Sequence, residues 1–499
     1  MSTASSVKRF DAIVIGSGQG GTPLASALAQ AGKQTALIEK AHIGGCCINE
    51  GCTPTKTMVA SGRAAYIVSR ASDYGVWNLS NPHAGKADDL SASKPDRGWD
   101  QIRGVVDMEQ VRQRKRDIVE SWRGGSEARV KGQKGLELFM GEASFKDANT
   151  LTVKLLEGQE VTVAAETIFI DTGDRPARPR LPGLDDVDQT RVLDSTSIME
   201  LGAVPDHLVI LGGGYIGLEF GQLFRRLGSQ VTILQRGKQL APREDPEIAD
   251  ALRKVLVEDG ITVLLNSSAT SVKSAHPEEV SVAYKNEQGE EATITGSHLL
   301  LAAGRTPNTD MLNLQAAGVK SDASGHIPVD EKLQTNVSHI YAIGDVKGGP
   351  AFTHVSYDDF RILRDTLISP SPSQPPRKVS DRVIPYVMYT DPQLAHVGLH
   401  ESEARKKYPN ATIKTASMPM AYVARALETD ESRGLMKAVV DDGTKQILGF
   451  TCFGIEGGEI MSIVQTAMLG KLPYPVLQDA IFAHPTLAES LNNVWGYLK

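Results

Sequence analysis

Three of the four cysteines in this chain, Cys46, Cys47 and Cys52, crowd into one short segment. The segment leads into a run from Pro54 onward that we predict to be helical, and a helix N-terminus stabilises the thiolate, the nucleophilic form of cysteine. Zinc binding is disfavoured, because the sequence offers no second cysteine or histidine pair with ligand spacing. Cys47 and Cys52, with four residues between them, therefore predict a redox-active dithiol.

The sequence contains two copies of a strand–turn–helix–strand unit, and these copies predict where electrons enter the protein. In both copies the glycines allow a tight turn and the close approach of a pyrophosphate, and the helix N-terminus offers N–H groups to it. We therefore predict two Rossmann-type dinucleotide-binding domains. The first copy comprises strand 12–15, turn Gly16-Ser17-Gly18-Gln19-Gly20-Gly21, helix 24–31 and strand 35–38. The second comprises strand 208–211, turn Gly212-Gly213-Gly214-Tyr215-Ile216-Gly217, helix 218–227 and strand 231–234.

The residues that follow the second strand of each copy distinguish the two nucleotides. Glu39 holds this place in the first copy, where a carboxylate accepts hydrogen bonds from the hydroxyls of an unphosphorylated ribose. Gln235 holds it in the second, and Arg236 and Arg243 follow, which is a pattern that accommodates a 2′-phosphate. The second copy therefore favours NADPH over NADH. The alternative is that both arginines are solvated loop charges.

Composition excludes several classes of protein. The 499 residues are 41% hydrophobic and 23% charged, as in an ordinary globular protein, and this length allows about three domains. A net charge of −7 lacks the basic excess of nucleic-acid binding. No apolar run is long enough to span a membrane, and the polar N-terminus lacks a signal peptide's apolar region. We expect a cytoplasmic protein with no nucleic-acid or membrane partner.

Three further segments complete the expected organisation. Residues 80–99 are polar and aperiodic, and we predict a surface loop or insertion there. Residues 369–376 form a Ser/Pro-rich linker, after which the strands predicted at 385–388, 435–440 and 446–453 indicate a separate C-terminal domain. Cys452 lies in the last of these apolar stretches, so we expect it to be a buried, inert thiol.

The segment 44–56 resembles the redox-active signature of the flavin-dependent pyridine nucleotide–disulfide oxidoreductases, which include glutathione reductase, dihydrolipoamide dehydrogenase and mercuric reductase. The resemblance covers nearly the whole chain, because the segments 170–176, 302–308, 340–345 and 484–489 are also similar to motifs of this family, in the same order. The run 347–363 most resembles the mercuric-reductase-like branch, which includes the bacterial reactive-chlorine-resistance flavoprotein.

The resemblance implies an α/β fold with two Rossmann-type dinucleotide-binding domains and a C-terminal α+β dimerisation domain. It also implies a homodimer that uses FAD and NADP(H). On this basis we expect an FAD-binding domain in two parts, 1–190 and 306–376, an NAD(P)H-binding domain over 191–305 and a dimerisation domain over 377–499.

The resemblance further implies the roles of the thiol relay. Cys52 would be the thiolate nearest the flavin, and Cys47 the thiol that meets the substrate. His484 would be the acid–base group of the relay, oriented by Glu489, and this segment would complete the site of the partner subunit.

The resemblance also implies roles for residues on the flavin side of the relay. Lys56 would lie beside flavin N5 and pair with Glu219, and Tyr215 would cover the flavin face until nicotinamide displaces it. Thr353 and His354 would begin a helix whose positive end faces the flavin pyrimidine carbonyl; His354 could instead be a packing histidine.

The resemblance also implies two sets of cofactor contacts. The FAD contacts are Gly16, Ser17, Gly18, Gly21, Glu39, Lys40, Gly45, Cys46, Lys56, Gly141, Thr172, Gly173, Asp345 and Thr353. The NADPH contacts are Gly212, Gly214, Ile216, Gly217, Arg236, Arg243 and Gly304.

The sequence departs from the family pattern at three positions. Cys46 replaces the usual threonine, so three thiols stand together and soft-metal binding becomes an alternative to simple space filling. Asp171 and Asp174 replace small residues, for which the sequence supplies no physical account. The metal-carrier domain and the C-terminal paired cysteines of mercuric reductases are not found in this sequence, and specificity for glutathione or lipoamide is equally unsupported.

We therefore expect a homodimeric FAD enzyme that passes electrons from NADPH through FAD to the Cys47–Cys52 pair and on to a disulfide, metal-ion or oxidant acceptor. One alternative is a flavin reductase that bypasses the thiols and reduces metal ions or quinones directly. Another is a metal-binding or redox-sensing protein that uses its cysteines without turnover. NADPH oxidation by a protein with stoichiometric FAD separates the enzymes from the last alternative.

Overall fold

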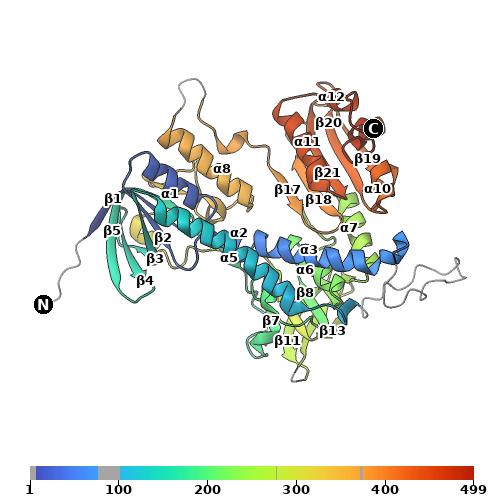
Figure 1. Cartoon of the computed structure of the whole chain (residues 1–499), viewed down its shortest axis with the longest axis horizontal. Coiled ribbons are helices and arrows are strands. Elements are labelled where there is room, and N and C mark those ends of the chain that lie inside the picture. The colour runs from blue at the N-terminus through green and yellow to red at the C-terminus, as the bar shows by residue number, and fades with distance from the viewer. Residues whose placement is uncertain (1–6, 77–101, 277, 371–374) are drawn as a thin grey trace, which may run out of the picture. The chain divides into compact units, whose positions relative to one another are not determined.

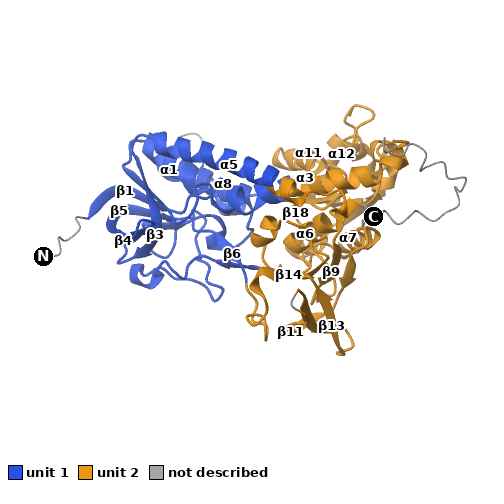
Figure 2. Cartoon of the chain, turned by 60° about the horizontal axis from the view of Figure 1, so that its bottom comes forward, with its two compact units in different colours: residues 1–57, 113–177, 304–382 blue, residues 58–112, 178–303, 383–499 orange. Residues whose placement is uncertain are grey.

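The computed structural model describes residues 7–76, 102–276, 278–370 and 375–499. The chain divides into two compact units (Figure 2): unit 1 comprises residues 1–57, 113–177 and 304–382, and unit 2 comprises 58–112, 178–303 and 383–499. The loop expected at 80–99 and the centre of the linker expected at 369–376 lie outside the described residues. The domain boundaries expected at 190, 305 and 376 stay predictions.

Unit 1 is built on a sheet whose parallel strands have β1 at their centre (Figure 1). β1 pairs with β2 on one side and with β5 on the other, β3 follows β2, β16 follows β5, and β4 joins β3 to β5 by antiparallel pairing. The strands are β1 (Lys8–Ile15), β2 (Thr35–Glu39), β3 (Leu136–Phe145), β4 (Thr150–Leu155), β5 (Glu160–Ile170) and β16 (Ile340–Ala342).

The apolar run of β1 is buried on both faces of this sheet, as expected for a central parallel strand. Val14 packs in one apolar cluster with Leu24 and Leu28 of α1 (Gly21–Gln30) and with residues of α8 (Thr353–Leu363). Its neighbour Ile13 belongs to the cluster on the opposite face. Covering one face with α1 fixes the glycine-rich turn at the carboxyl end of β1.

Unit 2 contains the second Rossmann-type sheet, with the parallel order β10-β9-β8-β14-β7. Its helix α6 carries an apolar face that packs on β8 and β9. A separate antiparallel sheet, β11-β12-β13, adjoins the Rossmann-type sheet. The elements are β7 (Val192–Leu193), β8 (His207–Leu211), α6 (Tyr215–Arg226), β9 (Gln230–Leu234), α7 (Pro246–Glu258), β10 (Thr262–Leu264), β11 (Ser268–Ser274), β12 (Val280–Lys285), β13 (Glu291–Gly296) and β14 (His298–Leu301).

The C-terminal part of unit 2 is an antiparallel sheet in the order β17-β18-β21-β20-β19, packed on α11. Cys452 is fully buried in β21, which confirms the expected burial of this thiol. The elements are β17 (Pro385–Met388), β18 (Gln393–Gly398), α9 (Glu401–Lys407), β19 (Ile413–Pro419), α10 (Ala424–Glu428), β20 (Leu435–Asp441), β21 (Ile447–Gly454), α11 (Gly457–Leu469), α12 (Tyr474–Gln478) and α13 (Ser490–Asn493).

The remaining elements carry or flank the cysteine segment. These are α2 (Gly45–Asn49), α3 (Cys52–Ser69), α5 (Met108–Gly132), β6 (Asp174–Pro176) and β15 (Arg305–Pro307). The predicted α/β class, with two Rossmann-type units and a C-terminal α+β part, is confirmed. No helix of the described ranges is long and apolar enough to cross a membrane.

Candidate active site

The two cysteines of the predicted relay lie at helix N-termini in unit 1. Cys47 belongs to the short helix α2, and Cys52 is the first residue of α3. The Sγ of Cys52 lies 3.4 Å from Oγ1 of Thr353, the first residue of α8. Cys52 therefore lies at the start of one helix and beside the start of another, and both helix dipoles favour a thiolate there.

The pKa of Cys47 depends on its neighbour Cys52 and on burial. All the cysteines are free thiols in this structure. The pKa of Cys47 is raised far above its ordinary value, first by a side-chain hydrogen bond with Cys52 and then by burial. Cys47 is therefore the thiol that keeps its proton, and Cys52 is the partner that accepts the hydrogen bond. This is the arrangement that the implied roles require, although the roles themselves stay predictions.

Cys46, the third thiol, faces an arginine that an aspartate holds in place. A terminal nitrogen of Arg305 lies 3.5 Å from Sγ of Cys46, while its Nε donates to Oδ1 of Asp174 at 2.7 Å. β6 and β15, which carry Asp174 and Arg305, pair with each other. Removal of water by the surrounding protein nevertheless raises the pKa of Cys46 to about 11, against the effect of Arg305. Cys46 is therefore a protonated thiol at neutral pH. The role of Asp174, which the sequence left unexplained, is to hold Arg305 in place.

The other unexplained residue, Asp171, is a buried carboxyl group beneath the first glycine-rich turn. Its Oδ2 accepts a hydrogen bond of 2.6 Å from the N–H of Gly21, at the N-terminus of α1. A Cβ atom on Gly18 would come within 2.6 Å of the same oxygen, so the carboxyl group occupies space that only a glycine leaves open. Burial raises the pKa of Asp171 well above its usual range, and the nearby Asp345 and Asp359 add to the increase.

Asp171→Asn is expected to stabilise the protein at alkaline pH. The folded-state pKa lies above the unfolded value of about 3.9, so the native chain loses stability as the pH rises from that value through the folded pKa. Asparagine keeps an acceptor for the N–H of Gly21 and carries no charge. Thermal denaturation at pH 8 should show a Tm about 2–4 °C higher, the effect of roughly 1 kcal/mol in a large domain.

The matched control for this prediction is Asp11→Asn. Asp11 accepts a hydrogen bond of 2.7 Å from the N–H of Gln34, but at an exposed site. Its substitution should leave the dependence of Tm on pH unchanged. An Asp171→Asn protein whose Tm falls with pH as steeply as that of the native chain would contradict this account of Asp171.

The first glycine-rich turn has the features of a dinucleotide site. Gly16 has a φ of 101°, and a Cβ there would lie 2.2 Å from the carbonyl oxygen of Asp171. Glu39 is buried at the end of β2, and one of its oxygens accepts from both the N–H and the hydroxyl of Ser17. The Oγ1 of Thr172 is buried without a hydrogen-bond partner in the described part of the chain. This orphaned hydroxyl, the glycine cradle and the buried carboxylate fit FAD.

The second glycine-rich turn has the same backbone and a different recognition residue. Gly212 has a φ of 117°, and a Cβ there would lie 2.3 Å from the carbonyl oxygen of Ala302. Gln235 takes the place of the acid and accepts from the N–H of Gly213 at 3.0 Å. Arg236 and Arg243 are both exposed. An uncharged amide beside two accessible guanidinium groups fits a phosphorylated ribose.

The proposed acid–base dyad is formed within unit 2. Nδ1 of His484 lies 2.9 Å from Oε2 of Glu489, and the imidazole is 72% exposed. Glu219 is buried in α6 and accepts from the N–H of Tyr389 at 2.8 Å. Lys56 belongs to unit 1, so its pairing with Glu219 stays a prediction.

Several predicted cofactor residues lie at turns or strand ends. In unit 1, Asp345 is the second residue of a short 3-10 turn that starts at Gly344, and burial raises the pKa of Asp345 to about 6. His354 stacks on Phe352, with ring centroids 5.4 Å apart, and its side chain is exposed, so both roles suggested for this histidine stay predictions. The other predicted residues are placed as follows: Lys40 after β2, Gly45 in α2, Gly141 in β3, Gly173 before β6, Ile216 in α6 and Gly304 before β15.

Sequence reasoning missed a group of residues around Tyr215. The Tyr215 hydroxyl donates to Oε1 of Glu244 at 2.7 Å, and the hydroxyl of Tyr386 lies 2.8 Å from the same oxygen. His400 lies on the far side of Tyr386. No motif signals this cluster, because Tyr386 and His400 reach it from β17 and from the residue before α9, far along the chain.

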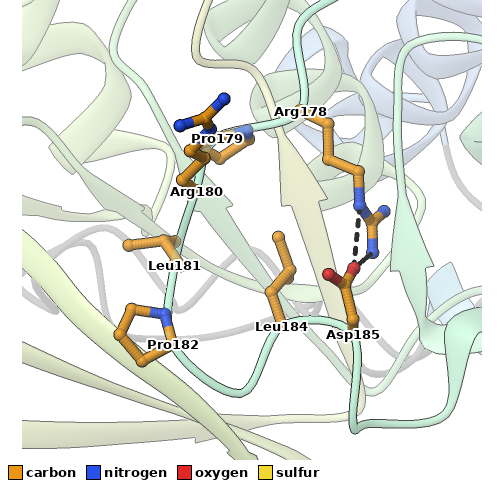
Figure 3. Close-up of a pocket in the computed structure, with 7 residues that line it drawn as sticks. All are labelled: Arg178, Pro179, Arg180, Leu181, Pro182, Leu184 and Asp185. Atoms are coloured by element: carbon orange, nitrogen blue, oxygen red, sulfur yellow. Dashed lines mark hydrogen bonds and ion pairs between the residues drawn. The ribbon is translucent and has the colours of Figure 1, made fainter.

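A separate surface hollow of about 500 Å³ lies in unit 2 (Figure 3). Arg178 forms an ion pair with Asp185 at its edge, at 2.8 Å. Its lining residues all come from the connecting segment between Arg178 and Asp185, and none of them is a predicted site residue. Among the residues with described positions, no group of three or more His, Cys, Asp or Glu side chains is arranged to hold a metal ion.

Paired glycine turns, a dithiol at helix N-termini and a C-terminal sheet define the class of flavin-dependent disulfide oxidoreductases. The chain belongs to the pyridine nucleotide-disulphide oxidoreductase family: residues 10–359 match its principal model and 384–494 match its dimerisation domain. Enzymes of this family are flavoproteins that use FAD and NAD(P)H, and the dimerisation domain indicates a homodimer.

Particular relatives are similar over almost the whole chain. The probable pyridine nucleotide-disulfide oxidoreductase RclA of Escherichia coli is 34% identical and covers 99% of this chain and 100% of its own. Mercuric reductase of Staphylococcus aureus is 33% identical, with 97% of this chain and 81% of its own covered. A solved Cu(II) complex of the HOCl-induced flavoprotein disulfide reductase RclA from Escherichia coli gives a TM-score of 0.83 at 34% identity, covering 98% of this chain and 99% of that one.

Proposed function

We propose that this protein uses NADPH to reduce an acceptor through FAD and the Cys47–Cys52 pair, and that a small-molecule disulfide is the acceptor class. The observation that carries the proposal is the placement of Cys52 at the start of α3 and beside the start of α8, hydrogen-bonded to a Cys47 that keeps its proton. We also propose that the domain boundaries predicted from sequence apply.

FAD, when bound, would supply the transfer of two electrons from NADPH to the Cys47–Cys52 disulfide. The chain's own residues then carry out thiol exchange. The thiolate of Cys47 attacks one sulfur of the acceptor disulfide, which forms a mixed disulfide and expels the first product thiolate. The thiolate of Cys52 attacks the sulfur of Cys47, which restores the internal disulfide and expels the second thiolate. The Cys47 proton protonates one product thiolate and a proton from solvent the other, so NADPH, one proton and the disulfide give NADP⁺ and two thiols.

The raised pKa of Cys47 makes a base necessary for the first of these steps. In the proposed homodimer, His484 removes the Cys47 proton and returns it to the product thiolate. Glu489 accepts a hydrogen bond from the Nδ1–H of His484, which leaves Nε2 for this exchange and stabilises the imidazolium.

The preference for NADPH gives a testable expectation at Arg236 and Arg243. A charge-assisted hydrogen bond contributes roughly 1.5–3 kcal/mol, so Arg243→Ala or Arg236→Ala should lower kcat/KM for NADPH about ten- to a hundredfold. Because NADH lacks the 2′-phosphate, its kcat/KM should change little. Steady-state kinetics with both nucleotides measures the two ratios.

Lys238→Ala is the matched control, because Lys238 is an exposed cation of the same loop that the assignment leaves out. It should change neither ratio by more than about twofold. A native enzyme that uses NADH as well as NADPH would contradict the assignment of both arginines.

A second candidate acceptor is a metal ion, because a structure similar to this chain is described as a Cu(II) complex of RclA. An acceptor screen with native protein and Cys47→Ser distinguishes the candidates. The screen should include disulfides, Cu(II), Hg(II), quinones and hypochlorite products. Loss of disulfide reduction in Cys47→Ser supports the proposal, whereas unchanged metal or quinone reduction in that variant identifies a route that bypasses the thiols.

A further inference from the structure

Tyr215 is held in unit 2 by one oxygen that it shares with a second tyrosine. Tyr215 is the first residue of α6, Glu244 lies just before α7, and Tyr386 lies in β17. Both hydroxyls contact Oε1 of Glu244, at 2.7 and 2.8 Å, and the two rings lie 5.7 Å apart. This oxygen therefore accepts two hydrogen bonds and keeps one donor if the other leaves.

The carboxyl group of Glu244 has few other hydrogen-bond donors within reach. The residue is 4% exposed, and its Oε2 is buried without a hydrogen-bond partner in the described ranges of the chain. The hydroxyl of Tyr386 has a second partner, because Nε2 of His400 lies 3.0 Å away. His400 in turn stacks on His396, with ring centroids 3.9 Å apart, and this fixes its ring beside Tyr386.

We propose that Glu244 and Tyr386 are positioning residues for Tyr215: Glu244 holds the Tyr215 hydroxyl in its resting place, and Tyr386 weakens this hold by sharing the same oxygen. The pair thereby sets how easily a nucleotide displaces the tyrosine. This inference rests on the proposed function and on the role that the family resemblance implies for Tyr215, which is to cover the flavin until nicotinamide takes its place.

The direction of each effect follows from the cost of breaking the Tyr215–Glu244 bond. When the Tyr215 ring moves away, Oε1 of Glu244 keeps only the Tyr386 donor, and a buried acceptor that loses a hydrogen bond costs free energy. The bond therefore opposes nucleotide binding. Glu244→Leu removes the hold and should tighten nucleotide binding about tenfold. Tyr386→Phe removes the donor that would remain, so that departure of Tyr215 would leave Oε1 unsatisfied. This strengthens the hold and should weaken binding about threefold.

The experiment titrates the FAD-loaded homodimer with tetrahydro-NADPH, which cannot donate a hydride, and measures Kd by calorimetry. Native protein, Glu244→Leu and Tyr386→Phe are compared, each with and without Tyr215→Phe. The single variants should change Kd in opposite directions, and both changes should fall below about twofold in the Tyr215→Phe background, because coupled residues are not additive. Glu244→Gln, which keeps an acceptor oxygen, should return Kd at least halfway from the Glu244→Leu value to the native one.

Effects of the same sign, or effects that persist in Tyr215→Phe, would overturn the inference and show that Glu244 and Tyr386 act only on the fold. If Glu244→Leu does not fold, as judged by circular dichroism and FAD content, the Tyr386→Phe pair decides the question alone. A holoenzyme that does not oxidise NADPH would refute the proposed function. A holoenzyme that does so but shows no coupling between these residues would refute this inference and leave the proposed function intact.

Discussion

Replacement of Cys52 by serine is expected to abolish the long-wavelength absorbance that a thiolate produces against the flavin. Cys52 is the thiol that lies at the start of α3 and 3.4 Å from the first residue of α8, so it is the one that the helix dipoles stabilise as a thiolate. Disulfide reduction should fall by about a thousandfold or more, because the pair can no longer form its internal disulfide. Anaerobic reduction with one equivalent of NADPH, followed by absorbance, measures the band.

Cys47→Ser provides the matched comparison for this result. The variant removes the exchange thiol and leaves Cys52, so it should lose disulfide reduction and show the absorbance band before NADPH is added, while the flavin is oxidised. NADPH should then bleach the band, because the electrons have no internal disulfide to reach. A native protein that binds FAD but shows no band after reduction, or a Cys52→Ser protein that still shows it, would refute the proposed thiol relay.

The Rossmann-type units could be predicted from sequence because local signals determine them. The apolar residues of β1 and β8 are followed at once by glycines that need positive φ, such as Gly16 and Gly212. Strand, turn and helix are then fixed within about thirty residues of chain. The predicted strand over 385–388 coincides with β17, and the helix predicted from Pro54 onward begins two residues earlier, at Cys52, because helix ends carry weaker signals than helix interiors.

The contacts that modify the site could not be predicted from sequence, because they join distant segments. Asp171 meets the turn at Gly21 only after β5 has paired with β1. Asp174 holds Arg305 through the pairing of β6 with β15, across a gap of more than a hundred residues. In each case, the sequence shows an unusual residue at a recognisable position but gives no sign of its partner.

Replacement of His484 by glutamine is expected to slow disulfide reduction about a hundredfold, the usual scale for loss of a general acid or base. The exchange step starts from a Cys47 whose pKa is raised and ends with a thiolate that needs a proton. His484 is suited to both transfers, because its imidazole is exposed and Glu489 binds its Nδ1 at 2.9 Å. Rapid-reaction measurements should show hydride transfer from NADPH to flavin unchanged.

Substitution of the two residues of the dyad should slow disulfide reduction to different extents. Glu489→Gln retains an acceptor for Nδ1 and loses only the charge that stabilises the imidazolium, so its rate loss should be smaller than that of His484→Gln. His276→Gln, at an exposed histidine outside the predicted site, is the control and should leave turnover unchanged.

The homodimer gives this prediction its sharpest test. The test uses a dimer that carries Cys47→Ser in one subunit and His484→Gln in the other. This dimer has one intact site if the His484 segment completes the site of the partner subunit, and no intact site if the segment acts within its own subunit. Action across the interface places both substitutions in the same site and leaves the other site intact, so such a heterodimer should keep about half of the native disulfide reductase activity. Activity near that of the His484→Gln homodimer would show that the dyad serves its own subunit, and unchanged turnover in His484→Gln itself would remove His484 from the mechanism.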